Sequence, residues 1–116
     1  MNGKISQIDA LSKSLEVAEM RHKVVSQNLA NVNTPNYHAV DLDFQKTLDA
    51  QLSDQKLTED GVELFERPDL VLRADGNNVD VDLEVGDLNK NVMLYQTYTQ
   101  LLSAKLGQMR TAIAGR

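Results

Sequence analysis

Two histidines are the side chains in this sequence best suited to bind a metal ion, because the chain contains no cysteine. His22 falls in a stretch with helical periodicity, and His38 follows a turn that contains a proline. A zinc or copper site needs several ligands at suitable spacing, and no carboxylate cluster accompanies this pair. We therefore expect no metal centre, and we interpret His22 as a polar residue tolerated in a helix seam.

The acidic run at residues 75–84 could in principle bind calcium. An EF-hand loop takes oxygen ligands at positions 1, 3 and 5 and a glycine at position 6. Counted from Asp75, position 5 is Val79 and position 6 is Asp80, so the pattern fails. These acids fit better at the start of a helix, where the macrodipole stabilises negative charge.

Other functions are excluded by motif and composition. The sequence has no Gly-rich phosphate loop, no Gly-x-Ser-x-Gly elbow and no His-Glu-x-x-His helix, so we expect no enzyme, no catalytic residue and no cofactor. A net charge of -5 disfavours nucleic acid. No segment approaches the roughly 20 apolar residues that cross a bilayer. The first residues lack the cationic and apolar parts of a secretory signal, and we expect a soluble chain without a cleaved signal peptide.

The composition favours helices. A chain of 116 residues provides one modest core. Only 4% of the residues are aromatic and none is Trp, which suits helix-on-helix packing better than a β-sandwich. We expect a mainly α fold with long terminal helices in a coiled-coil-like layer. One structural unit would comprise an N-terminal helix at 1–33, a middle segment at 34–79 and a C-terminal helix at 80–116.

The N-terminal helix is predicted from about Ser6 to Asn31, because apolar positions there step alternately by three and four residues. Polar residues between these positions predict a narrow stripe, as in a coiled coil. Pro35 lacks an N–H donor and prevents the helix from running much further. The predicted seam consists of Ile8, Leu11, Leu15, Ala18, His22, Val25, Leu29 and Val32.

A second stripe predicts a C-terminal helix from Val81 to Ile113, with Asp80, Asp82 and Glu84 at its start. At 1.5 Å per residue this helix is about 50 Å long, whereas a compact domain of this size has a radius of gyration near 13 Å. The subunit must therefore be elongated. The seam residues expected to meet other helices are Val85, Leu88, Val92, Tyr95, Leu102, Leu106, Met109 and Ile113.

The middle segment is less regular. Phe44, Leu48 and Leu52 recur every four residues and predict a short amphipathic helix. Asp60-Gly61 marks a turn. Two short alternating runs, one with Val62 and Leu64 and one with Leu70 and Leu72, are separated by Arg67-Pro68-Asp69 and predict a small hairpin or an extended loop.

Two runs carry a resemblance to a known family. The first, at residues 29–44, reads LANVNTPNYHAVDLDF and resembles the signature of bacterial flagellar axial proteins, in which Leu-Ala-Asn is followed by Asn-Thr-Pro-Gly-Tyr. Asn36 replaces the usual Gly, and Asn tolerates the positive φ that this position requires. The second, at residues 75–84, reads DGNNVDVDLE and is similar to rod proteins of the proximal-rod type. The motif comprises Asn28, Asn31, Asn33, Thr34, Pro35, Asn36 and Tyr37.

The resemblance covers about residues 5–113 and implies a structural subunit of the proximal rod of the flagellar basal body. Such a subunit polymerises through its terminal helices into a helical or tubular part of the drive shaft. The implied partners are other rod subunits, a rod-base adaptor protein, and the membrane ring or export gate. The resemblance also implies type III export and a place in the periplasmic rod. Heptads alone would equally suit a soluble helical-hairpin adaptor or another coiled-coil interaction protein, which is the alternative.

Overall fold

The computed structural model describes residues 3–52 and 63–115 of the chain. It measures 65 × 26 × 19 Å, and its radius of gyration is 17.7 Å. A compact domain of about 100 residues would have a radius of gyration near 13 Å, so the prediction of an elongated, mainly helical subunit is confirmed. In chain order the elements are α1 (Gly3–Ala30), β1 (Val40–Leu42), α2 (Phe44–Leu52), β2 (Leu64–Glu66) and α3 (Val81–Ala114).

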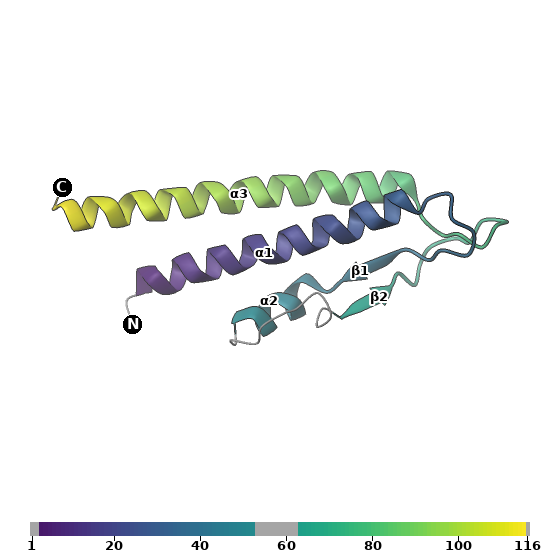
Figure 1. Ribbon diagram of the computed structural model, residues 1–116, viewed down its shortest axis with the longest axis horizontal. Coiled ribbons are helices and arrows are strands. Elements are labelled where there is room, and N and C mark those ends of the chain that lie inside the picture. The colour runs from purple at the N-terminus through teal and green to yellow at the C-terminus, as the bar shows by residue number, and fades with distance from the viewer. Residues whose placement is uncertain (1–2, 53–62, 116) are drawn as a thin grey trace.

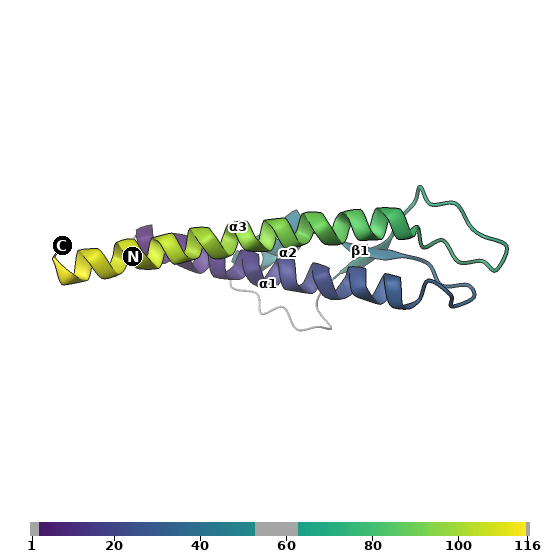
Figure 2. The same cartoon turned by 90° about the horizontal axis from the view of Figure 1, so that it is seen from above.

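Helix α1 is the central layer of the molecule. Figure 1 shows α3 running antiparallel along one side of α1, with α2 and the two strands on the other side. The start of α1 and the end of α3 lie towards one end of the molecule, and the turns that follow α1 and precede α3 lie at the opposite end. Seen from above, α3 crosses α1 at a shallow angle (Figure 2). The last turns of α3 project beyond the start of α1 (Figure 1).

The apolar surface of α1 is broader than the sequence pattern predicts. Val17 and Val24 are buried together with Leu42 of β1, and Met20 packs against the same cluster. These α1 residues form a second stripe beside the predicted seam, because they lie three or four residues apart. The expectation of a narrow stripe is therefore wrong, since α1 is covered on two sides. Partly buried residues complete this cluster: Val40, Phe44 and Leu48.

The two short strands form an antiparallel ribbon. Residue 40 pairs with 66, 41 with 65 and 42 with 64. The predicted helix at Phe44–Leu52 is confirmed, but a hairpin between the runs at 62–64 and 70–72 is wrong. Leu64 belongs to β2, which pairs with a strand more than twenty residues earlier, and residues 70–72 form no strand. Residues 60–62 lie outside the described part of the chain.

Helix α3 begins as its acidic start predicts. The Asp80 carboxylate accepts hydrogen bonds from the backbone N–H groups of Asp82 at 3.0 Å and Leu83 at 3.2 Å, so Asp80 is the N-cap. An N-cap of this kind satisfies donors that have no partner inside the helix. At the other end Gly115 adopts a left-handed φ of 70° and closes the helix.

The face of α3 that meets α1 coincides only in part with the apolar seam. The buried residues of α3 are Glu84 and Asn91, which the heptad pattern did not select. Three seam residues are partly buried: Leu88, Leu102 and Met109. The other five are between 39% and 82% exposed in this chain: Val85, Val92, Tyr95, Leu106 and Ile113.

Two valines, one on each long helix, test which face of each helix is covered. Val17 is 0% exposed and Val85 is 41% exposed. Val17→Ala should lower the free energy of unfolding by about 1 to 3 kcal/mol, because it leaves a cavity between α1 and the ribbon. Val85→Ala should change it by less than about 0.5 kcal/mol.

Both substitutions alter helix propensity equally, so the difference between them reports packing. Urea unfolding followed by circular dichroism measures it. Equal losses in the two variants would show that the second stripe of α1 is not packed.

Candidate functional site

The family motif forms a turn that leads the chain from α1 back towards β1. Asn31 continues the end of α1, donating from its side chain to the carbonyl of Gln27 at 2.8 Å. Its Oδ1 accepts from the Thr34 hydroxyl at 3.1 Å. Asn36 has a φ of 62°, which confirms the positive φ predicted at this position. Exposed residues make up the outer part of the turn: Asn33, Thr34, Pro35 and Asn36.

Asn28 connects several segments of the site through hydrogen bonds of its side chain. It is 1% exposed, and its side-chain amide donates to the carbonyl of Val40 at 2.8 Å and to the Glu84 carboxylate at 3.1 Å. Its Oδ1 accepts from the Val40 N–H at 3.1 Å and from the Tyr37 hydroxyl at 2.9 Å. One carboxamide therefore joins α1 to the turn, to β1 and to the first turn of α3, with its hydrogen-bonding capacity filled.

A second pair of asparagines closes the turn from the side of α3. Asn77 is 0% exposed, and its amide donates to the carbonyls of Asn31 at 2.9 Å and Thr34 at 2.8 Å. The Oδ1 of Asn78 accepts from the Ala39 N–H at 2.6 Å. No structural role was predicted for these asparagines from the sequence. Two successive asparagines beside a glycine were the available signal, because Asn side chains often hydrogen-bond backbone groups of nearby turns.

Gly76 fits this site because it has no side chain. Its φ is 82°, and a Cβ built there would collide with the Oδ1 of Asn36. The backbone N–H of Asn36 also donates to the carbonyl of Asp75 at 2.9 Å. The two family runs, separate in the sequence, are thus in direct contact in the fold.

Arg67 links the ribbon to α3. Its guanidinium lies 3.3 Å from Asp41 of β1 and 3.7 Å from Glu84, and it also pairs with Asp87. Arg21 of α1 lies 3.4 Å from the same Asp41 carboxylate. Three carboxylates and two guanidinium groups therefore meet between the ribbon and the helices.

The electrostatics of this junction follow from burial. Glu84 is 0% exposed, and burial raises the pKa of its carboxyl, although the Asn28 hydrogen bond and the Arg67 charge act in the opposite direction. Burial also raises the pKa of the Tyr37 hydroxyl, and the nearby Glu84 charge adds to this effect. For Arg67 burial lowers the pKa, but the Asp87 hydrogen bond and the surrounding carboxylates outweigh it and the pKa is raised.

The metal and calcium readings gain no support from the geometry. His22 lies on α1 beside α3, whereas His38 lies 3.3 Å from Glu66 of β2, so the histidines do not share a site. Asp75 lies 3.7 Å from Arg73 and Asp80 caps α3. No group of three or more potential metal ligands occurs among the residues that the structure describes. Nor does any helix in the described ranges have the length and apolarity to cross a membrane.

The predicted seam of α1 lies against the rest of the fold. Two of its positions are buried, Ala18 and Val25. The other apolar positions of the seam are partly buried: Ile8, Leu11, Leu15, Leu29 and Val32. His22, interpreted as a seam polar residue, is exposed.

Comparison with known proteins decides what kind of protein carries this junction. The chain is 31% identical to the flagellar basal body rod protein FlgB of Bacillus subtilis, over 93% of each chain. It is 30% identical to FlgB of Aquifex aeolicus over 94% of each chain. The chain belongs to the FlgB family. Similarity to FlgB of Cereibacter sphaeroides, 30% identical, extends over 99% of each chain. No protein-family model matches the chain.

Membership in the FlgB family makes the chain a structural protein of the flagellar basal body rod, and not an enzyme. The resemblance seen in the sequence is thereby confirmed. The FlgB relatives match nearly the whole chain, so the two helices, the turn and the ribbon all fall within the similarity. This favours the rod assignment over the helical-hairpin adaptor.

Glu84→Gln tests the buried carboxylate through the pH dependence of stability. An unfolded glutamate has a pKa of about 4.3, and the folded pKa is higher. The folded chain therefore binds this proton more tightly, and the contribution of Glu84 to stability falls as pH rises from the unfolded to the folded pKa. Relative to Glu84→Gln, the unmodified chain should lose unfolding free energy across that interval.

Denaturant unfolding of both proteins from pH 4 to pH 8 measures the difference, and most other titrating groups cancel in the comparison. If the unmodified chain instead gained stability over Glu84→Gln as pH rose, the buried carboxylate would be stabilised as an anion and this account of the junction would be wrong.

Proposed function

We propose that the chain is a structural subunit of the proximal rod, which polymerises through its terminal helices and helps to form the drive shaft. The observation that carries this proposal is the exposed apolar row on α3. A row of this kind along a 34-residue helix is suited to helix packing with another chain. Its members are Val85, Val92, Tyr95, Leu106 and Ile113.

The proposal assigns different tasks to the parts of the chain. Residues 1–33 and 80–116 form the assembly core, and residues 34–79 hold the two helices in a fixed relation. The motif turn at Asn31–Tyr37 acts through geometry, since the Tyr37 hydroxyl donates to Asn28 Oδ1 and so ties the turn to α1. The end of α3 that extends past α1 is well placed to reach a neighbour (Figure 1).

The proposed partners are other rod subunits, together with the rod-base adaptor protein and the membrane ring or export gate. The proposed location is the periplasmic rod, reached by type III export without cleavage of a signal peptide. The FlgB names of the relatives support the rod and the basal body. An elongated shape of 65 Å with apolar helical surface supports assembly side by side with other subunits.

Leu106 and Gln108 provide a matched test of the assembly face. Leu106 is 47% exposed in the isolated chain, so Leu106→Glu should leave its folding intact. In the rod the same change would bury an unpaired carboxylate, which costs several kcal/mol in every contact. Gln108 is also exposed but lies off the seam, and Gln108→Glu should cost little.

Both variants are expressed in flagellated cells whose own copy has been replaced. Immunoblots of purified basal bodies and swimming assays should show loss of Leu106→Glu from rods and normal incorporation of Gln108→Glu. Normal incorporation of Leu106→Glu would show that this face of α3 does not take part in rod assembly.

A further inference from the structure

Charge is unevenly distributed along the chain. All 17 acidic residues lie within residues 1–87, which contain eight of the 12 basic residues and so carry a net charge of -9. A basic side chain stabilises the helix dipole only within the last turn of a helix, so dipole compensation does not account for the bases in the middle of α3. Residues 88–116 contain no acidic residue and four basic ones: Lys90, Lys105, Arg110 and Arg116.

The fold places the opposite charges at opposite ends of the long axis. The last turns of α3 lie at one end of the molecule, and the segment between β2 and α3 lies at the other (Figure 1). We call residues 67–82 the acidic end. Arg67 faces the buried junction, and Arg73 offsets one acid, since it lies 3.7 Å from Asp75. The exposed acids of this end are Asp69, Asp75, Asp80 and Asp82.

Each charged end also exposes apolar side chains. Ile113 is 82% exposed and lies with Arg110 in the last two turns of α3, which we call the basic end. In the acidic end Val71 is 85% exposed and Leu72 is 57% exposed. Specific protein contacts combine apolar area with complementary charge. The two ends of one molecule therefore match each other in chemistry.

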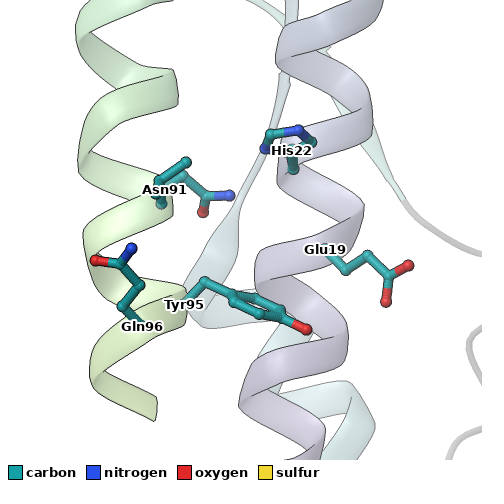
Figure 3. Close-up of a pocket in the computed structure, with 6 residues that line it drawn as sticks. Glu19, His22, Asn91, Tyr95 and Gln96 are labelled. Carbon is teal, nitrogen blue, oxygen red and sulfur yellow. The ribbon is translucent and has the colours of Figure 1, made fainter. Parts of the chain in front are cut away.

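The basic end is presented along the long axis because the middle of α3 is anchored on α1. Figure 3 shows the side chains of Asn91 and Tyr95 directed from α3 towards α1. The Asn91 amide donates to the carbonyl of Ala18 at 2.8 Å. From there α3 continues as one helix to Ala114, and its last turns project beyond the start of α1 (Figure 1).

We propose that the basic end of α3 docks on the acidic end of a second copy of this chain, in a head-to-tail contact. The proposal rests on the proposed function and names the partner at one of its contacts. Two basic ends repel each other, so charge favours a contact between unlike ends over a symmetric dimer. A contact between unlike surfaces does not close on a pair of molecules, and it can repeat along an open series.

The contact should be weak in isolation. The molecule is 26 × 19 Å across its long axis, which is less area than the roughly 800 Å2 per partner of a standard interface. Sedimentation equilibrium of the full chain at low salt should show species larger than a dimer as the concentration rises. Association should weaken in 1 M salt, because the Debye length there is only about 3 Å.

Arg110→Glu and Asp69→Lys each reverse one charge at one end. Both residues are exposed, so both variants should fold, which circular dichroism checks. Each variant alone should self-associate roughly tenfold more weakly than the unmodified chain, because attraction at the contact becomes repulsion. Lys90→Glu is the matched control, since it makes the same change of charge at an exposed position of α3 far from the basic end. It should associate as the unmodified chain does.

Mixing the two variants tests the head-to-tail geometry. Arg110→Glu keeps an intact acidic end and Asp69→Lys keeps an intact basic end, so the mixture contains one complete contact. It should form a 1:1 dimer with about the affinity of the unmodified contact and no larger species. In a symmetric dimer through the two α3 ends, by contrast, Asp69→Lys alone would associate as strongly as the unmodified chain.

The outcomes distinguish this inference from the proposed function. An unmodified chain that stays monomeric at every concentration, or a mixture that does not recover the dimer, would overturn the head-to-tail contact and leave the rod assignment in place. Equal weakening by Lys90→Glu would show that net charge, and not the two ends, controls association, and would also overturn it. Absence of the unmodified chain from purified basal bodies would refute the proposed function itself.

Discussion

The carboxamide of Asn28 imposes the constraint on which the rest of the structure depends. It is buried, so each of its donors and acceptors needs a partner. The partners come from the turn, from β1 and from α3. These segments are separated by up to 56 residues in the sequence, and the bonds can all form only when the ends of the two long helices and the ribbon occupy one arrangement. Specific polar bonds thus set the register of α1 against α3.

The carboxylates around Arg67 follow from this constraint. Glu84 must lie beside Asn28, which places an acidic group in a buried site. Arg67 supplies the compensating charge from the far end of β2 and also contacts Asp41 and Asp87. Removing one partner from a buried charge pair is usually far more destabilising than the pair is stabilising. The junction therefore favours one position of α1, α3 and the ribbon over arrangements in which one of them is shifted along the others. It leaves much of the apolar surface of α3 exposed.

Local signals in the sequence were sufficient to predict the helices, the short helix at Phe44–Leu52 and the positive φ of Asn36. Periodicity located these elements because it depends on neighbouring residues. It did not predict the burial of Glu84 and Asn91, whose partners are Asn28 and the carbonyl of Ala18. Those partners are distant in the sequence, and no period encodes them.

The ribbon was missed for a similar reason. The pairing of β1 with β2 joins strands that are separated by α2, whereas the sequence favoured the nearest alternating runs. For the apolar seam of α3, periodicity alone does not distinguish a contact with α1 from a contact with another chain. The contact of α3 with α1 through Glu84 and Asn91 leaves five of the eight seam residues exposed in this chain.

Asn28→Leu is the most direct test of the central claim, because leucine has the same branched arrangement of side-chain heavy atoms as asparagine and removes all of its hydrogen bonds. Glu84, Tyr37 and both backbone groups of Val40 would then lose a partner in a buried site. Urea unfolding of the isolated chain, followed by circular dichroism, should show a loss of at least about 3 kcal/mol in the free energy of unfolding. A variant as stable as the unmodified chain would contradict the account, since apolar packing alone would then set the register of the two helices.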